Sequence, residues 1–371
     1  MKRRIIIYII LIFTFYIASI EVKAIAGSNR EIEYDEIQNV LKSELNNEID
    51  FESYVNDLIS GKEVFDLKNI IKKCLELVKN EIKNNMDTLG KLISIAIMSA
   101  IFTNLSLAFK NEQVSETGYY VIYLLLFTIL ITTFISASYI VSEALESVII
   151  FMKALVPTYF IAVGLSTGVG SSVVFYEMSL IIISFTEIFL LKIILPLINI
   201  YLIIMLVNNL SKEDMLSKFA DLLATIIKWM LNTLLAAIIG FNTIQGMITP
   251  VLDKAKRSAL LRASQAIPGI GDAIGGVTET LLGASLVLKN AIGVVGLIII
   301  IVIGTVPLIK LAIIVLIYKT SGAILQPISD KRILKCISAS AKSSAMLLHT
   351  LFIGVILFIL TITIVTISTI K

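Results

Sequence analysis

The sequence predicts an all-α polytopic integral membrane protein, and three observations support this class. Hydrophobic residues make up 57% of the 371 residues and charged residues only 16%, with a mean hydropathy of +0.92. Several apolar runs reach the roughly 20 residues that a helix needs to cross a bilayer. The sequence shows no pattern of a parallel sheet or of a membrane barrel.

Residues 1–24 are predicted to be a signal sequence. "MKRR" is a basic start, Ile5–Ile20 is an apolar core, and small residues ending at Ala24 or Ala26 suit a cleavage site. The apolar core is slightly long, so an uncleaved first membrane helix is the alternative. In both cases the positive-inside rule places the chain after Ala24 outside the cytoplasm.

Residues 25–91 are predicted to be a small, acidic, helical extracytoplasmic region. Residues 27–91 contain 14 of the 28 acidic residues of the chain and nine basic ones, a net charge of −5. Apolar residues at three- and four-residue steps predict a helix with one apolar stripe. The stripe consists of Leu67, Ile70, Ile71, Cys74, Leu75, Val78 and Ile82. We interpret it as a packing surface, on which Cys74 is a small apolar residue.

Residues 92–371 are predicted to form a polytopic membrane domain with about six to eight crossings. The candidate spans are Leu92–Phe109, Tyr119–Val141, Val148–Leu165, Val173–Leu191, Ile193–Leu210, Trp229–Leu252, Ile292–Tyr318 and Met346–Ile370. Val173–Leu191 and Ile193–Leu210 form either one bent rod or a tight hairpin. Ile292–Tyr318 is either one tilted helix or two half-helices around Pro307.

Basic segments leave the topology of Ile292–Tyr318 open. Asp253–Arg262 precedes this span and Asp330–Lys335 follows it, and both segments are basic. A single crossing places one of them outside the cytoplasm, against the positive-inside rule. A re-entrant hairpin would place both inside.

Residues 211–228 are predicted to form an amphipathic helix in the membrane interface. Ser211 and Asp214 match a capping box, and an apolar face follows. The alternative is a coupling helix that docks onto a cytoplasmic subunit.

A glycine-rich segment, residues 262–296, contains "QAIPGIGDAIGG". Its spacing, G-x-G-x-x-x-G-G, differs from the G-x-G-x-x-G of a dinucleotide site, and neither a preceding strand nor G-K-[ST] is present. The segment is therefore not predicted to bind a nucleotide.

Membrane packing explains the segment better. Gly271 and Gly275 have GxxxG spacing, which lets helices approach closely, and Gly276 adds another small residue. Pro268 and Gly269 are predicted to break a helix. Asp272 and Glu279 lie seven residues apart and share a helix face. The segment is either a polar loop or a broken element at an interface or pore, and its glycine density favours the second.

At "QAIPGIGDAIGGVTETLLGASLVLKNAIGVVGLIII" the sequence resembles the most characteristic segment of the stage III sporulation protein AE family. The export signal, acidic region, polytopic core and length also match. The resemblance implies a multi-pass protein of the mother-cell membrane around the forespore. It implies a channel-like complex, with a secretion-ATPase-like subunit and ring-forming subunits, that maintains the engulfed forespore and activates its late sigma factor. The resemblance carries over no catalytic residue.

Four charges lie within the predicted spans, where charges are costly and mark functional sites by default. They are Lys153, Glu177, Glu187 and Lys310. Glu177 and Glu187 could pair across helices with Lys153 or Lys192, and a structural ion pair is the alternative to a functional role. Ten residues turn the two glutamates apart by about 80°, which weakens the case for a two-carboxylate site.

Three function classes remain after the resemblance: a channel-complex subunit, a stand-alone secondary transporter, and a non-conducting scaffold. Prolines and glycines around Pro157 and Pro268 predict interrupted helices, as in transporters. No nucleophile, base or metal-ligand constellation is present, so we expect neither an enzyme nor a cofactor. Cys74 and Cys336 are far apart without a C-x-x-C, and the net charge of +3 does not indicate nucleic acid. The expected partners are the other subunits, membrane lipid and further copies of the chain.

Overall fold

The computed structural model describes residues 34–45, 50–61, 67–108, 112–167, 169–210, 214–265, 271–327 and 329–368, with no strand among them. The expected all-helical class is confirmed. The signal sequence, residues 1–24, lies outside the described residues. So do Pro268 and Gly269.

Two short helices and one long helix come first. They are α2 (Asp35–Leu45), α3 (Phe51–Ile59) and α4 (Leu67–Ala108). The carboxylate of Asp50 accepts a hydrogen bond from the backbone N–H of Ser53 and caps α3, while Phe51 is fully buried. Among the described side chains the apolar stripe on α4 is only partly covered, because Leu75 and Ile82 are exposed while Cys74 and Val78 are half-buried.

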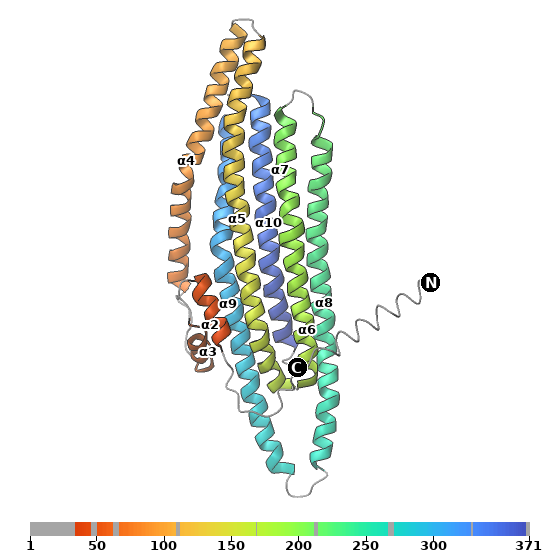
Figure 1. Ribbon diagram of the computed structural model, residues 1–371. Helices are drawn as coiled ribbons and strands as arrows, with labels where there is room; N and C mark the ends of the chain where they lie inside the picture. The colour runs from red at the N-terminus through yellow and green to blue at the C-terminus, as the bar shows by residue number, and fades with distance from the viewer. Residues whose placement is uncertain are drawn as a thin grey trace, which may run out of the picture. The chain divides into compact units, whose positions relative to one another are not determined.

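The remaining helices run up and down beside one another (Figure 1). They are α5 (Glu112–Thr167), α6 (Val169–Glu187), the π-helix η1 (Ile188–Ile194), α7 (Leu195–Leu210), α8 (Ser217–Gln265), α9 (Gly271–Leu325) and α10 (Lys331–Ser368). α6, η1 and α7 follow one another without a break and form one rod.

These helices are longer than the predicted spans. The spans Tyr119–Val141 and Val148–Leu165 both lie within α5, which also continues through Pro157. α9 continues through Pro307, so Ile292–Tyr318 is not a re-entrant hairpin. The interruption expected at Pro157 is absent, and of the two alternatives for Ile292–Tyr318 the structure has one continuous helix. Proline is tolerated inside membrane helices where neighbouring groups satisfy the freed backbone groups.

Two further features bear on the open topology of α9 and on the predicted amphipathic helix. The two basic segments around α9 lie at its opposite ends, Asp253–Arg262 within α8 and Asp330–Lys335 at the start of α10. Residues 217–228 are the first turns of the 49-residue α8 and not a separate interfacial helix. Their apolar face is divided, because Leu223 and Ile227 pack inward while Phe219 is 55% exposed.

Five stretches within the described residues are long and apolar enough to cross a membrane. They are Thr117–Leu165, Phe175–Leu210, Ser217–Ile244, Gly283–Leu325 and Lys331–Thr366. This arrangement is consistent with a polytopic membrane protein. The number of crossings and their orientation stay predictions.

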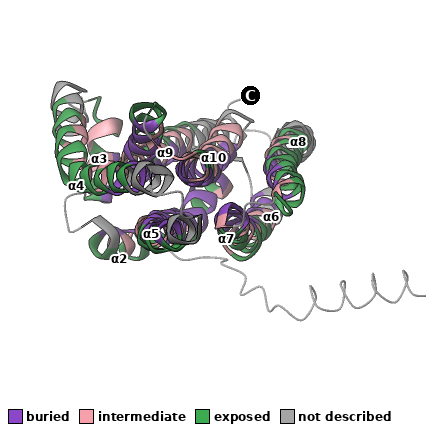
Figure 2. Ribbon diagram, turned by 90° about the horizontal axis from the view of Figure 1, so that it is seen from above, coloured by how far each residue is buried: buried purple, intermediate pink, exposed green. Residues whose placement is uncertain are grey.

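The centre of the bundle is formed by α5, α9 and α10, where buried residues concentrate (Figure 2). Glycines permit the close approach of these helices. An ideal Cβ on Gly296 would lie 2.6 Å from Leu155 Cδ2, and one on Gly304 would lie 2.8 Å from Val355 Cγ2. A Cβ on Gly354 would lie 2.5 Å from Leu145 Cδ2. The core is therefore closed by side chains that fill the space the glycines leave.

Candidate functional site: a polar file on α5 and η1

Two of the four predicted intramembrane charges meet on the outside of the bundle. Lys153 Nζ of α5 lies 2.6 Å from Glu187 Oε2, at the last residue of α6. The side chains are 43% and 34% exposed, so the pair is neither buried nor fully open. Of the pairings considered from the sequence, the structure contains this one.

Helix α5 and the rod formed by α6, η1 and α7 meet again at a second polar contact. Ser138 of α5 donates a hydrogen bond to Asn199 Oδ1 of α7, at 3.2 Å. Both residues line an open groove of about 460 Å³ between α5 and the η1–α7 segment, together with Tyr139, Ser142 and Pro196. The groove lining is otherwise aliphatic and aromatic.

Between these two contacts α5 carries two carboxylates on its outer side. Glu143 and Glu146 are exposed, and Glu146 accepts a hydrogen bond from Ser142 at 3.1 Å. Lys192 of η1 follows Leu191, which lines the groove, and is exposed. Within the described part of the chain none of these three charges has an ion-pair partner within 4 Å.

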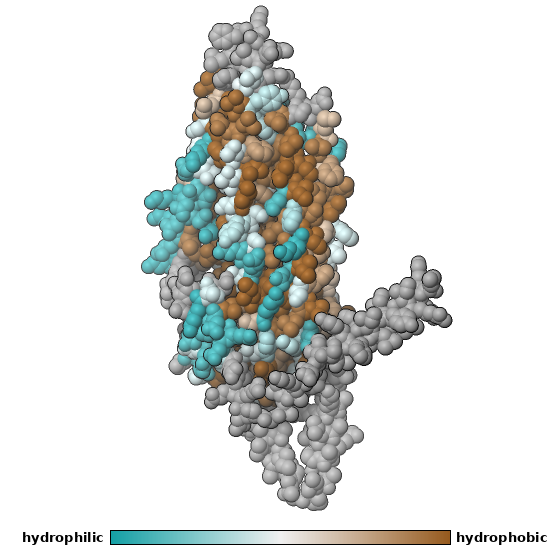
Figure 3. All heavy atoms as spheres, in the orientation of Figure 1, coloured by the Kyte–Doolittle hydropathy of each residue, from teal (hydrophilic) through white to brown (hydrophobic). Residues whose placement is uncertain are grey.

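We call this set the polar file: Ser138, Ser142, Glu143, Glu146, Lys153, Glu187, Lys192 and Asn199. Figure 3 shows a narrow band of hydrophilic residues down an otherwise hydrophobic face of the bundle, the face on which α5 and α7 lie in Figure 1. Charge on such a face is costly against lipid, so the file is the best candidate for functional polar surface.

The π-helix contributes to the site. η1 widens the helix over Ile188–Ile194, and Pro196 follows in the next turn without a backbone N–H. Single-turn π segments are frequent at functional sites. Here η1 turns Lys192 outward beside the groove while Leu190 and Ile194 stay buried.

The other predicted site residues are not brought to the polar file. Glu177 is exposed on α6, and Lys310 is partly buried on α9. The residues Gly271, Asp272, Gly275, Gly276 and Glu279 lie in the first turns of α9, where the structure describes the backbone as helical. Their proposed packing or pore role stays a prediction.

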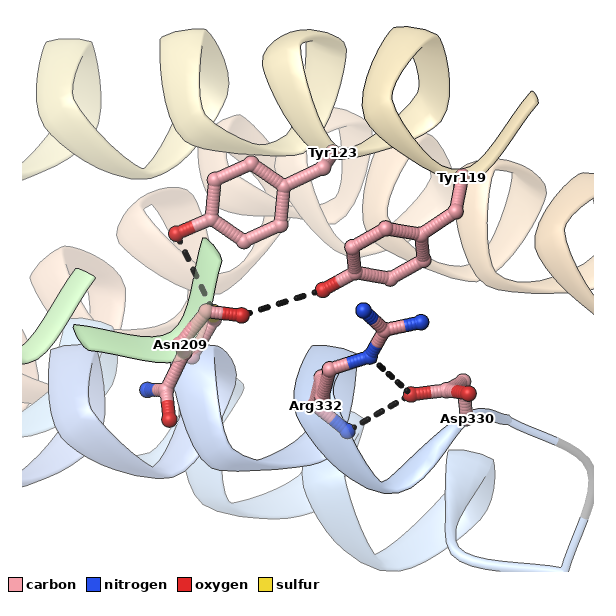
Figure 4. A network of polar contacts seen from close by, with 6 residues as sticks. Tyr119, Tyr123, Asn209, Asp330 and Arg332 are labelled. Atoms are coloured by element: carbon pink, nitrogen blue, oxygen red, sulfur yellow. Dashed lines mark hydrogen bonds and ion pairs between the residues drawn. The ribbon is translucent and has the colours of Figure 1, made fainter. Parts of the chain in front are cut away.

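A second polar cluster was not predicted from the sequence (Figure 4). It joins the starts of α5 and α10 to the end of α7. The Tyr119 hydroxyl donates to the Asn209 carbonyl at 3.2 Å, and Arg332 stacks on the Tyr119 ring with its guanidinium carbon 3.4 Å from the ring centroid. Tyr123 donates to the Leu206 carbonyl, and Arg332 Nε lies 3.5 Å from Asp330 Oδ1.

A buried lysine was also missed. Lys289 of α9 is fully buried, and its Nζ donates to the Thr366 carbonyl at 3.3 Å. That carbonyl is in the last turn of α10, where the helix dipole favours a positive charge. The Thr366 hydroxyl shares a 2.8 Å hydrogen bond with the Tyr159 hydroxyl. The signal in the sequence was a single lysine, followed by Asn290, in a largely apolar stretch, and this alone does not identify a partner.

Within the described residues no group of three or more His, Cys, Asp or Glu side chains could hold a metal ion. What the arrangement offers is a charged, hydroxylated surface on a long apolar bundle. Such an architecture is consistent with the class of polytopic helical membrane proteins, in which polar side chains on an apolar exterior are the first candidates for functional residues.

Comparison with known proteins narrows the class. The model of the stage III sporulation protein AE family matches residues 49–369, and the chain therefore belongs to this family. Stage III sporulation protein AE of Bacillus subtilis (strain 168) is 28% identical over 310 residues, which cover 83% of this chain and 78% of that protein. No solved structure matches.

Proposed function

We propose that the chain is an integral membrane subunit of a channel-like sporulation complex that links mother cell and forespore. In this proposal it resides in the mother-cell membrane around the forespore. It acts with a secretion-ATPase-like subunit and ring-forming subunits, and it is needed for forespore maintenance and for late sigma-factor activity after engulfment.

The observation that carries the proposal is the family match, which extends over residues 49–369 and so includes every helix from α3 to α10. The five long apolar stretches support a membrane location. The polar file adds a surface that a subunit of a conducting assembly could use and that lipid solvates poorly.

The test is an in-frame deletion in the native spore former. The readouts are a forespore reporter for the late sigma factor and the volume of the engulfed forespore. We expect engulfment to finish, the reporter to stay dark and the forespore to shrink. Normal spores with an active reporter would contradict the proposal.

Complementation of the deletion distinguishes the channel subunit from the scaffold. A scaffold tolerates the loss of charge in the polar file, so Lys153→Met/Glu187→Leu would restore both readouts. A channel subunit loses passage while the complex still assembles. Gly271→Leu and Gly275→Leu serve as comparison variants, since in both cases a large side chain is expected to disturb assembly.

Solute accumulation in vesicles distinguishes a stand-alone transporter from a channel subunit. A transporter acts without the other subunits, so vesicles containing only this chain would accumulate a solute, and the polar-file variants would abolish accumulation. A channel subunit purified alone gives no such accumulation.

A further inference from the structure

Helix α5 is longer than a bilayer is thick. Its candidate span Thr117–Leu165 has 49 residues, which is about 74 Å at 1.5 Å per residue. The hydrocarbon of a bilayer is about 30 Å thick, and even a tilt of about 40° reduces the height only to about 56 Å. The exposed charges Glu143, Glu146 and Lys153 divide the exterior of this stretch, so it is not one continuous apolar surface.

The face formed by α5, η1 and α7 exposes large apolar side chains next to these charges. Leu124, Ile135 and Tyr139 of α5 are 58%, 61% and 66% exposed, and Ile203 and Val207 of α7 are 48% and 46% exposed. An apolar face of a membrane protein is covered by lipid or by another protein, and lipid solvates charges poorly. The charges of this face therefore bear on which of the two covers it.

The charges of the polar file indicate what that cover is. The Ser138–Asn199 hydrogen bond and the Lys153–Glu187 ion pair fix the register of α5 against η1 and α7. On α5, Glu146 lies between Ser138 and Lys153, the two residues that make these contacts. On the other rod, Lys192 lies between their partners, Glu187 and Asn199. Glu146 and Lys192 therefore lie at a similar position along the bundle axis. They nevertheless form no ion pair with each other within the protomer.

A two-fold axis parallel to the helices preserves height and exchanges the two sides of the face. It would bring α5 of one copy opposite η1 and α7 of the other. Lys192 of each protomer would then face Glu143 and Glu146 of its partner, twice per dimer. Isologous interfaces require this kind of self-complementary patch.

We propose that the face formed by α5, η1 and α7 is the surface through which two copies of this chain associate. The polar file lies at the centre of the interface, with its unpaired charges neutralised by the second copy. The open groove beside Tyr139 provides room for side chains of that copy to interdigitate. This self-association goes beyond the proposed function and does not depend on it.

The test uses the full chain, produced in a host membrane without other sporulation proteins. Tyr139→Cys is introduced with Cys74→Ser and Cys336→Ala, and disulfides are formed with copper phenanthroline. Trp229→Cys on α8 is the matched control, because Trp229 is 67% exposed and α8 lies at the edge of the bundle away from α5 (Figure 2). We expect a cross-linked dimer with Tyr139→Cys and none with Trp229→Cys.

Charge reversal then tests the complementarity. Lys192→Glu is expected to lower the association constant of the dimer by about tenfold or more, which is the size commonly measured for close interfacial charge pairs. The triple variant Glu143→Lys/Glu146→Lys/Lys192→Glu restores opposite charges across the axis and is expected to recover the dimer. This rescue separates loss of the interface from loss of folding.

Several results would overturn the inference. One is a monomer in mass photometry of nanodiscs together with no cross-link at Tyr139→Cys. Another is a dimer that cross-links through Trp229→Cys, or one that is insensitive to Lys192→Glu.

Discussion

Lys153 Nζ and Glu187 Oε2 lie 2.6 Å apart and join the C-terminal half of α5 to the junction between α6 and η1. The pair helps to fix the register of two antiparallel rods, which the Ser138–Asn199 hydrogen bond also joins. Exposed ion pairs contribute little to stability, whereas breaking a buried pair by removing one partner is costly. Because this pair is partly exposed, its contribution to stability is expected to lie between these two cases.

Removing one member of this pair should be worse than removing both. Lys153→Met leaves the Glu187 carboxylate without its cation on an apolar face, and Glu187→Leu leaves the lysine without its anion. We expect each single variant to lower the unfolding free energy by about 1–2 kcal/mol, between the exposed and buried limits. The double variant should lose less than either single variant. The measurement is thermal unfolding in detergent, followed by the monodisperse fraction in size-exclusion chromatography.

Lys91 and Asp87 of α4 provide a control for this comparison. They form an ion pair one turn apart with side chains 57% and 71% exposed, so Lys91→Met should change stability very little. If the double variant at Lys153 and Glu187 is as unstable as the worse single variant, the prediction is wrong. The cost would then not come from leaving one charge without its partner.

Replacing a glycine of α9 by alanine should change the stability of the bundle according to the side chains that face that glycine. Gly304 faces Val355 of α10, whose two methyl groups lie 2.8 and 3.2 Å from an ideal Cβ, and a β-branched side chain cannot easily turn away. Gly304→Ala is expected to destabilise the bundle by about 1–3 kcal/mol through overpacking. Gly283 of the same helix has open space around its Cβ position, so Gly283→Ala should stabilise by about 0.5–1 kcal/mol. Paired thermal midpoints of these variants measure the difference, and equal shifts would contradict close packing at Gly304.

The stacking of Arg332 on Tyr119 should depend on the planar guanidinium. Arg332→Ala is expected to lower the free energy of unfolding by about 1–2 kcal/mol, a value typical of a partly desolvated cation–π contact. Arg332→Lys keeps the charge without the flat fork, so it should restore only part of the loss. A double-mutant cycle with Tyr119→Leu measures the coupling by thermal unfolding. Lys331→Ala is the control, since this exposed neighbour has no partner among the described residues. A coupling near zero would mean that the two side chains do not support each other.

The class of the fold and the family could be predicted from the sequence because both depend on local signals. Apolar runs of membrane length give helices, and the glycine-rich segment resembles one family. The Lys153–Glu187 pair was among the pairings considered, since charges within spans are few. Helix continuity was harder to predict. Glu143 and Glu146 separate two apolar runs as a loop would, but α5 continues because both side chains point outward and leave the backbone hydrogen bonds intact.

The contacts that no pattern predicted join residues far apart in the chain. Arg332 and Tyr119 are separated by more than 200 residues, and so are the partners Tyr159 and Thr366. Neither side chain of such a pair carries a local sign of the other. The glycines that pack helices together here, such as Gly304 and Gly354, also stand outside the GxxxG motif, because each one accommodates a single side chain of a neighbouring helix.

The turn between α7 and α8 should weaken in acid because of Asp214. The Asn208 side chain donates to the Asp214 carboxylate at 2.7 Å, and Lys335 Nζ lies 3.8 Å away. The hydrogen bond from Asn208, followed by one from Ser217 and the charge of Lys335, lowers the pKa of Asp214 below its ordinary value. A lowered folded-state pKa means that the stabilisation is complete above the unfolded pKa of about 4. It is lost as the pH falls through the lower, folded value.

Hydrogen exchange at the start of α8, corrected for the intrinsic pH dependence, tests this expectation. Protection of residues 217–220 in the native chain should fall below about pH 4 and approach that of Asp214→Asn, whose own protection should change little. Lys335→Met should move the transition upward in pH, because the remaining causes hold the pKa of Asp214 less far down. Glu76→Gln, an exposed site on α4, should leave the transition in place. A native chain whose protection difference from Asp214→Asn is the same at pH 3 and pH 7 would show that the carboxylate charge does not hold this turn.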